Sequence, residues 1–309
     1  MSTPATRPAS RIATAAPRLG LVGVEVLESV YQHRLLSTAQ IHRLHTPAAT
    51  RQWTRRVLAR LHQLGLVEVT RAPGGMGLWY LTERGALTVE TLGDRAEPRR
   101  KLLAPEHAAG PLQAHTLAVN DVGVAFVEAA RERGDECGPL AWRHEIHHPL
   151  GTPPGRRYND HLIADALLTY QLTAPDGPST FYYRFVELDR ATLQVADLAE
   201  KLARYARLHD YTPAPTRPGR APVALWRHSY PVFPTLLVVL DGNRPRPLLE
   251  RRREKLLALC TGDERLRATP AVEIAVCLLD DLTSHGPFAA IFRILNAPDT
   301  PADWLGQPA

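Results

Sequence analysis

Residues 162–208 constrain the fold of this chain more than any other stretch, because they indicate strand, turn, strand and helix in direct succession. Leu162–Leu172 is rich in apolar and β-favouring residues, and residues 174–178 (APDGP) are a turn signal. Phe181–Leu188 is aromatic and β-branched, which predicts a second strand. Apolar residues then recur at helical spacing over Thr192–Leu208. We therefore expect an antiparallel hairpin followed directly by an amphipathic helix.

Two acidic side chains in this hairpin are predicted to face each other. Side chains alternate between the two faces of a strand, so Glu187 and Asp189 share one face. If the turn centres near Asp176, the register sets Asp165 opposite Glu187, with Cβ atoms about 4.5–5.5 Å apart. A divalent cation between the carboxylates would remove their repulsion, because hard cations choose carboxylate oxygens. The pattern predicts that Asp165 and Glu187 hold Mg²⁺.

Positive charge is concentrated at the start of the chain. Residues 1–75 contain ten arginines and three acids, a net charge of +7, whereas the whole chain has +5. A basic part attached to a near-neutral body is typical of nucleic-acid binding, so DNA is the expected partner. Residues 1–18 are rich in Ser, Thr, Pro, Ala and Arg and contain no acid, which indicates a disordered basic arm.

Composition also bears on the compartment. No run of 18 apolar residues occurs, so we expect neither a membrane span nor a membrane partner. The three cysteines are far apart in the sequence, which is typical of reduced thiols in a cytoplasmic protein. With 34 arginines but only three lysines, the composition indicates a bacterial protein from a GC-rich genome.

Residues 19–90 have the element order of a winged helix-turn-helix domain. The expected helices and strands are Leu21–His33, Thr38–Leu44, Ala49–Leu64, Leu66–Arg71 and Leu78–Thr82. Ser37 is the expected N-cap of the second helix. We expect Trp53, Val57, Leu61 and Leu64 on the core face of the third helix, and a Gly-rich wing between the two strands.

The opposite face of that third helix is basic. Arg51, Gln52, Arg55 and Arg56 would contact base edges or phosphates in the major groove, and Arg71 on the wing would contact the neighbouring backbone or minor groove. The alternative is a winged helix that contacts protein, with a merely solvated arginine face. The basic bias of this region favours DNA.

The remaining residues indicate an α/β domain, so the whole chain is expected to be α+β. Residues 91–111 are rich in Pro, Gly and charge and are expected to form a linker, and residues 296–309 a disordered tail. Strands and helices alternate over residues 112–295, as in a sheet with covered faces. The expected elements outside the hairpin region are Leu112–Arg131, Leu140–His148, Pro222–Trp226, Pro234–Leu240, Leu248–Cys260 and Val272–Leu279. Glu145 is either a further acid of the site formed by Asp165 and Glu187 or an exposed acid on an edge strand.

The hairpin and helix resemble the core of the PD-(D/E)XK nuclease superfamily, a restriction-endonuclease-like fold. Asp165 stands at the "PD" position and Glu187 at the "(D/E)" position, but Asp189 stands where Lys is expected. In some branches of the superfamily the lysine has moved to the following helix, where this chain has Lys201. The resemblance implies a catalytic set of Asp165, Glu187 and Lys201, with Asp189 as a further ligand or as a partner of Arg190.

Over about residues 20–295 the chain also resembles the replication-relaxation family of bacterial, often plasmid- or mobile-element-borne, proteins. The residues that carry this resemblance are His115 with Asn120 and Asp121, residues 164–168 (ADALL), residues 187–190 (ELDR) and residues 198–205 (LAEKLARY). The family implies a DNA-binding role in replication or relaxation of extrachromosomal DNA.

Two functional interpretations remain open from the sequence. In the first, the protein is a Mg²⁺-dependent DNA nickase or endonuclease of PD-(D/E)XK type, in which the metal activates water. In the second, it is a non-catalytic winged-helix DNA-binding regulator whose degenerate nuclease-like body serves homodimerisation or partner binding. The clustered acids favour the first and the missing Glu-x-Lys pattern favours the second. Carboxylates within reach of a shared metal, with Lys201 pointing at them, would support the enzyme.

Overall fold

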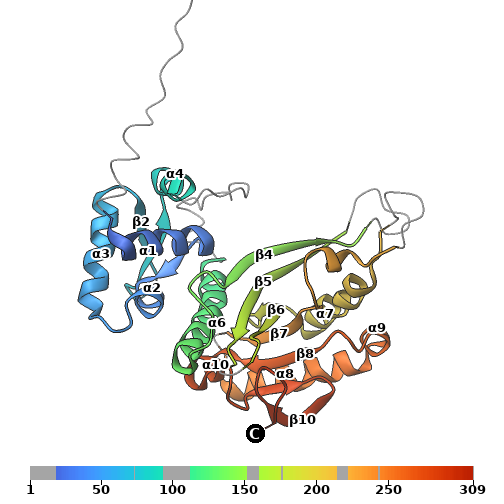
Figure 1. The fold of residues 1–309 in the computed structure, drawn as a ribbon. Coiled ribbons are helices and arrows are strands. Elements are labelled where there is room, and N and C mark those ends of the chain that lie inside the picture. The colour runs from blue at the N-terminus through green and yellow to red at the C-terminus, as the bar shows by residue number, and fades with distance from the viewer. Residues whose placement is uncertain are drawn as a thin grey trace, which may run out of the picture. The chain divides into compact units, whose positions relative to one another are not determined.

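The computed structural model describes residues 19–72, 74–92, 112–151, 160–174, 177–213, 222–242 and 244–308 (Figure 1). The chain divides between Asn120 and Asp121 into two compact units. The mixture of helices and two sheets confirms the expected α+β class. The predicted basic arm, residues 1–18, and nearly all of the predicted linker, residues 91–111, lie outside the described residues.

Four helices and a three-stranded sheet follow one another in the N-terminal unit over the described residues up to 92. They are α1 (Gly20–His33), β1 (Leu36–Ser37), α2 (Thr38–His45), α3 (Arg51–Gln63), β2 (Val67–Arg71), β3 (Gly77–Leu81) and α4 (Glu83–Leu92). The strand order is β1-β3-β2, and β2 and β3 form the predicted antiparallel hairpin. Ser37 caps α2 as expected, in a reciprocal capping box with Gln40.

The core face of α3 agrees with the prediction only in part, because Leu61 is buried as expected and Val57 is half-buried, whereas Trp53 is not on that face. Trp53 is 37% exposed, whereas Thr54 and Leu58 are buried. Thr54 is buried because its hydroxyl has partners, lying 2.7 Å from the Thr46 hydroxyl and 2.9 Å from His42 Nδ1. Hydrophobic periodicity places apolar residues on the core face, so it selected Trp53 and passed over its neighbour Thr54. Thr54 is buried there because its hydroxyl is hydrogen-bonded.

The C-terminal unit is built on a seven-stranded sheet with the order β10-β9-β8-β7-β6-β5-β4. Its strands are β4 (Trp142–Pro149), β5 (His161–Leu172), β6 (Thr180–Asp189), β7 (Thr235–Leu240), β8 (Ile274–Leu278), β9 (Phe292–Ile294) and β10 (Ala297–Ala302). Strands β4, β5 and β6 are antiparallel neighbours, whereas β6, β7 and β8 run parallel. The other elements are α6 (Leu112–Arg133), of which the part from Asp121 on belongs to this unit, α7 (Val195–Asp210), the 3₁₀ helix η2 (Leu225–His228), α8 (Arg246–Gly262), α9 (Glu264–Ala268) and α10 (Leu279–His285).

Helices α7 and α8 connect the parallel strands and cover one face of this sheet (Figure 1). The core on that face joins Leu202 of α7 and Leu256 of α8 to Phe185 and Val238 of the sheet. These side chains are all fully buried, so α7 is fixed against β5 and β6 by apolar packing as well as by the polar contacts described below.

Two sequence-based expectations for the C-terminal unit are wrong. The predicted disordered tail, residues 296–309, forms strand β10 and buries Trp304, whose ring packs edge-on against Phe126 of α6 at 5.2 Å. The predicted strand Pro222–Trp226 is replaced by η2, in which Trp226 donates to the His209 carbonyl. In both cases a buried tryptophan orders a proline-containing segment through contacts with residues outside that segment.

Gly123 on α6 allows a close approach to the sheet. A Cβ atom there would lie 2.4 Å from the ring of Trp142 on β4. We expect Gly123→Ala to lower the free energy of unfolding by about 1–3 kcal/mol through overpacking, measured from the midpoint of urea denaturation. Gly138→Ala is the control, because a Cβ atom there meets nothing within 4 Å. Equal stabilities for the two variants would contradict this account of the packing.

Candidate functional site

The hairpin of β5 and β6 brings Asp165 and Glu187 together. The paired residues of the two strands run to Ala166 opposite Val186, and the next position in the same register sets Asp165 opposite Glu187. Next to that position a side-chain acceptor takes the place of a main-chain carbonyl in the pairing of the two strands, because the Leu188 N–H donates to Asp165 Oδ2 at 2.8 Å. The carboxylate of Asp165 is thus part of the pairing between the two strands.

Helix α7 presents Lys201 and Tyr205, one turn apart, to these carboxylates. Lys201 Nζ lies 3.4 Å from Asp165 Oδ1 and forms a short hydrogen bond with Glu187 Oε2. The Tyr205 hydroxyl donates to Glu187 Oε1 at 2.5 Å. Both oxygens of Glu187 therefore have partners on α7, and a single ammonium bridges the two acids. We refer to Asp165, Glu187, Lys201 and Tyr205 as the carboxylate site.

Burial and mutual charge control protonation in the carboxylate site. Burial and the neighbouring Asp165 carboxylate raise the pKa of Glu187 to about 8, although Lys201 and Tyr205 oppose the rise. Burial alone would lower the pKa of Lys201, but the charges of Glu187 and Asp165 raise it above its usual value. Glu187 therefore keeps a proton to higher pH than an ordinary glutamate, beside a lysine that stays charged. Burial and Glu187 also raise the pKa of Tyr205, so its hydroxyl keeps the proton that it donates.

The edge strand β4 has an irregular backbone next to the site. Glu145, which the β4–β5 register sets opposite Asp165, has a φ of 51°, a value that few residues other than glycine adopt. Pairing between the strands continues on both sides of this residue, and its side chain is exposed. Backbone strain of this kind is stored where the surrounding structure enforces it, often at functional sites.

Asp189 lies in a different set of contacts from the carboxylate site. Arg252 of α8 holds it in a bidentate ion pair, with Nη2 3.0 Å from Oδ1 and Nε in a short bond to Oδ2. Arg190, the expected partner of Asp189, instead pairs with Asp241 at 3.0 Å. The structure thus brings Asp165, Glu187 and Lys201 together but places Asp189 at the junction of β6 and α8.

The donor set of the carboxylate site fits Mg²⁺ chemically. Two carboxylates reach the same cationic atom, and Mg²⁺ is commonly held by one or two carboxylates with water completing its shell. Among the described residues, no group of three His, Cys, Asp or Glu side chains could hold a metal. Asp165 and Glu187 would therefore supply all the protein ligands known there, and the Lys201 ammonium would have to give up its bridging position.

A second candidate surface lies within the N-terminal unit. Arg51 and Arg55 of α3 and Arg71 of β2 line a concavity of about 540 Å³ with Trp79 and other residues of α2 and the hairpin. None of the described residues that line it is acidic. Gln52 and Arg56 are exposed on α3 but do not line the concavity.

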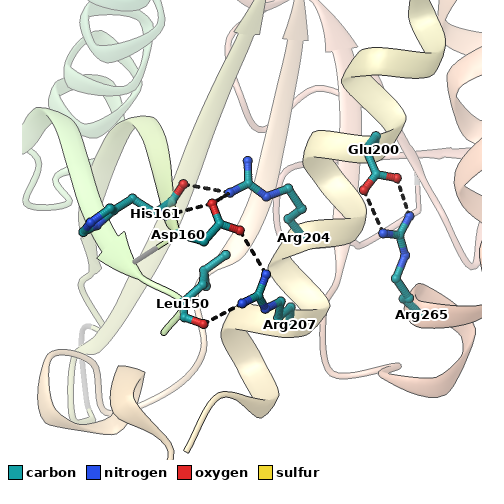
Figure 2. Close-up of polar contacts among 7 residues, drawn as sticks. All are labelled: Leu150, Asp160, His161, Glu200, Arg204, Arg207 and Arg265. Carbon is teal, nitrogen blue, oxygen red and sulfur yellow. Dashed lines mark hydrogen bonds and ion pairs between the residues drawn. The ribbon is translucent and has the colours of Figure 1, made fainter. Parts of the chain in front are cut away.

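Helix α7 is also tied to the end of the β4–β5 hairpin by contacts that the sequence analysis did not identify (Figure 2). Asp160 accepts from Arg204 Nη2 at 2.7 Å and from Arg207 Nη1 at 2.9 Å. The same two arginines donate to the carbonyls of His161 and Leu150, at 2.8 Å each. Tyr205 was likewise missed as a partner of Glu187, although its spacing of four residues from Lys201 placed both on one helix face.

The fold and the carboxylate site define a mixed α/β protein in which a helix lysine bridges two strand carboxylates. A family model described as replication-relaxation matches residues 27–222, a range that includes α3 and the whole carboxylate site. The chain belongs to the replication-relaxation family. Searches of curated proteins and of solved structures gave no match. Within the described residues, no helix is long and apolar enough to cross a membrane.

The raised pKa of Glu187 gives a pH dependence with a defined sign. The ordinary pKa of a glutamate is 4.5, whereas that of Glu187 in the folded protein is about 8. Between these two pH values the folded protein keeps a proton on Glu187 that the unfolded chain has already released. The stability contributed by that proton is present at low pH and lost as pH rises through this window. We expect the free energy of unfolding of the wild type, minus that of Glu187→Gln, to decrease from pH 4.5 to pH 8 in denaturant titrations. Lys201 titrates above this window because its pKa is raised. A difference that stays constant or increases would contradict the assignment.

The Asp160 contacts predict a smaller effect on stability. Asp160→Asn removes the charge that pairs with both Arg204 and Arg207, so we expect a loss of about 1 kcal/mol in the free energy of unfolding. The matched control is Glu200→Gln. Glu200 lies on α7, the helix that carries Arg204 and Arg207, and its ion pair with Arg265 is more exposed to solvent than the Asp160 pairs (Figure 2). That control should change stability by no more than about 0.5 kcal/mol. Chemical denaturation of both variants at low salt tests the difference, and equal losses would show that the Asp160 pairs contribute nothing specific.

Proposed function

We propose that the protein binds DNA through its N-terminal unit and acts in replication or relaxation of plasmid or mobile-element DNA in the bacterial cytoplasm. The observation that carries this proposal is the concavity lined by Arg51, Arg55 and Arg71 without an acid among its described lining residues. Membership of the replication-relaxation family supports the biological setting.

The charge arrangement suits a phosphate backbone. The guanidinium groups of Arg51 and Arg55 come from one helix and that of Arg71 from the adjoining hairpin, so they converge from two elements on one surface. Arginine forks match phosphate oxygens in bidentate geometry, and cations lining a concavity raise the local affinity for a polyanion. Gln52 and Arg56 are exposed beside it and are the side chains available for base edges. The helix order and the hairpin support a winged helix whose α3 enters the major groove.

The carboxylate site supports a second proposal, that the C-terminal unit is a PD-(D/E)XK-like nuclease that nicks DNA with Mg²⁺. The favouring observation is that Asp165 and Glu187 reach one shared cation position, with Lys201 pointing at both. Bound Mg²⁺ would supply Lewis-acid activation of water and stabilise negative charge on the phosphate. Asp165 and Glu187 would hold the ion after Glu187 has released its proton, and Lys201 would be free to donate to a phosphate oxygen.

The alternative is a non-catalytic DNA-binding regulator with a degenerate nuclease-like body that serves dimerisation or partner binding. It is favoured by the saturation of Glu187, whose two oxygens already accept from Lys201 and Tyr205. In that case the carboxylate site is a buried ionic cluster that holds α7 on the β5–β6 hairpin.

The DNA-binding proposal predicts a charge-specific loss of affinity. Arg55→Ala should weaken binding of duplex DNA about tenfold and reduce the dependence of affinity on salt, because one phosphate contact is lost. Arg60→Ala is the control, since Arg60 is exposed on the same helix, has the same charge and does not line the concavity. Fluorescence anisotropy at several salt concentrations measures both variants. If both lose affinity equally, the concavity is not the binding surface.

The nuclease proposal predicts metal-dependent nicking of supercoiled plasmid. The wild type should convert plasmid to open circles with millimolar Mg²⁺ or Mn²⁺, and Asp165→Asn and Glu187→Gln should each abolish conversion. Melting curves with and without metal should show a stabilisation in the wild type that both variants lack, because a ligand that binds only the folded state stabilises it. Absence of both nicking and metal stabilisation, with DNA binding intact, would leave the non-catalytic regulator as the function.

A further inference from the structure

A cleft in the C-terminal unit, on the exposed side of α8, has features of a binding site that the proposals above do not use. Its volume is about 690 Å³, and its walls come from α8 and from the β9–β10 edge of the sheet. Arg253 and Leu257 line it from α8, and Arg293 and Asp299 line it from β9 and β10. Ligand pockets for small molecules typically fall between about 300 and 1,000 Å³.

Two half-buried guanidinium groups lie on opposite walls of this cleft. Arg293 Nη1 donates to the Asp299 carbonyl oxygen at 3.0 Å, which fixes that side chain against β10. Among the described residues, no hydrogen bond or ion pair holds the side chain of Arg253. Burial and the charge of Arg293 both lower the pKa of Arg253, so the two cations are close enough to repel each other.

Two acids that act on Arg253 are engaged elsewhere. Glu250 and Asp281 are close enough to favour the charged form of Arg253. Arg246, however, already binds Glu250 through Nε at 2.8 Å and Asp281 through its two Nη atoms at 2.7 and 3.0 Å. Two half-buried cations that repel each other across the cleft therefore favour a bound anion between them.

We propose that this cleft binds the phosphate group of a small phosphorylated ligand of nucleotide size, with Arg253 and Arg293 donating to the phosphate oxygens. Guanidinium groups match phosphate oxygens in charge and in planar donor geometry. Leu257 and Ala258 supply an apolar wall beside them, against which a base or sugar would pack.

The rim of the cleft favours a short anion over DNA. Glu254 and Asp299 are exposed and line the same cleft. Their carboxylates would repel an extended polyanion that runs across the rim, whereas a single phosphate held between the two arginines would lie next to cations. Hydroxyl or amino groups of a nucleotide could donate to the same carboxylates.

The test is isothermal titration calorimetry of the full-length protein with AMP, inorganic pyrophosphate and adenosine. We expect AMP and pyrophosphate to bind and adenosine, which lacks phosphate, to bind at least about tenfold more weakly. Arg253→Gln and Arg293→Gln should each weaken AMP binding about tenfold. Arg251→Gln should leave it unchanged, because Arg251 is exposed on the same helix and does not line the cleft.

Further measurements separate loss of phosphate binding from loss of folding and from binding of DNA in the cleft. Circular dichroism confirms that each variant is folded, and Arg253→Lys, which keeps the charge, should retain part of the affinity if Arg253→Gln fails to fold. A short DNA duplex should not displace AMP; displacement that Arg253→Gln abolishes would assign the cleft to the DNA backbone and overturn the proposal. No phosphate-dependent binding, or equal losses in Arg251→Gln and Arg253→Gln, would also overturn it. Duplex binding through the N-terminal unit should be the same in all these variants.

Discussion

The ammonium of Lys201 is the charge on which the central arrangement depends. Two carboxylates from neighbouring strands, Asp165 and Glu187, lie on one side of it, and Glu187 is almost fully buried. Like charges at this spacing are unfavourable unless a cation or a proton compensates them, and the Lys201 ammonium is such a cation. The same contact helps to fix α7 to the β5–β6 hairpin, together with the apolar packing of the helix, so the position of the helix and the chemistry of the site depend on each other.

The polar residues of helix α7 make two separate sets of contacts with the strands, and its apolar residues pack in the core. Lys201 and Tyr205 contact the carboxylates, while Arg204 and Arg207 contact Asp160 at the end of the preceding hairpin. Leu202 is buried between these sets. Because the two sets of contacts are about one turn apart, the rotation of the helix about its axis is fixed by charge as well as by packing. The carboxylate site depends on the position of Lys201, so it requires that α7 be held rigidly.

The sequence predicted the hairpin and its acids because the relevant rules are local. A turn signal and strand alternation set Asp165 and Glu187 together without knowledge of the rest of the fold, and the resemblance to the PD-(D/E)XK superfamily pointed to Lys201 on the following helix. It failed where partners are distant or polar groups are buried. Arg252, the partner of Asp189, lies 63 residues away, and no local pattern connects the two. The face of α3 was misassigned because Thr54 is buried by hydrogen bonds, and residues 296–309 because Trp304 packs on α6.

Asp165 makes the β5–β6 pairing itself sensitive to ligand chemistry. Its Oδ2 accepts the Leu188 amide that would otherwise pair with main chain, while its Oδ1 faces Lys201. Any event that redirects this carboxylate, whether protonation, metal coordination or departure of the lysine, also changes a bond between two strands of the sheet. Occupancy of the site would therefore be transmitted as a change in strand separation, which amide hydrogen exchange at Leu188 reports directly.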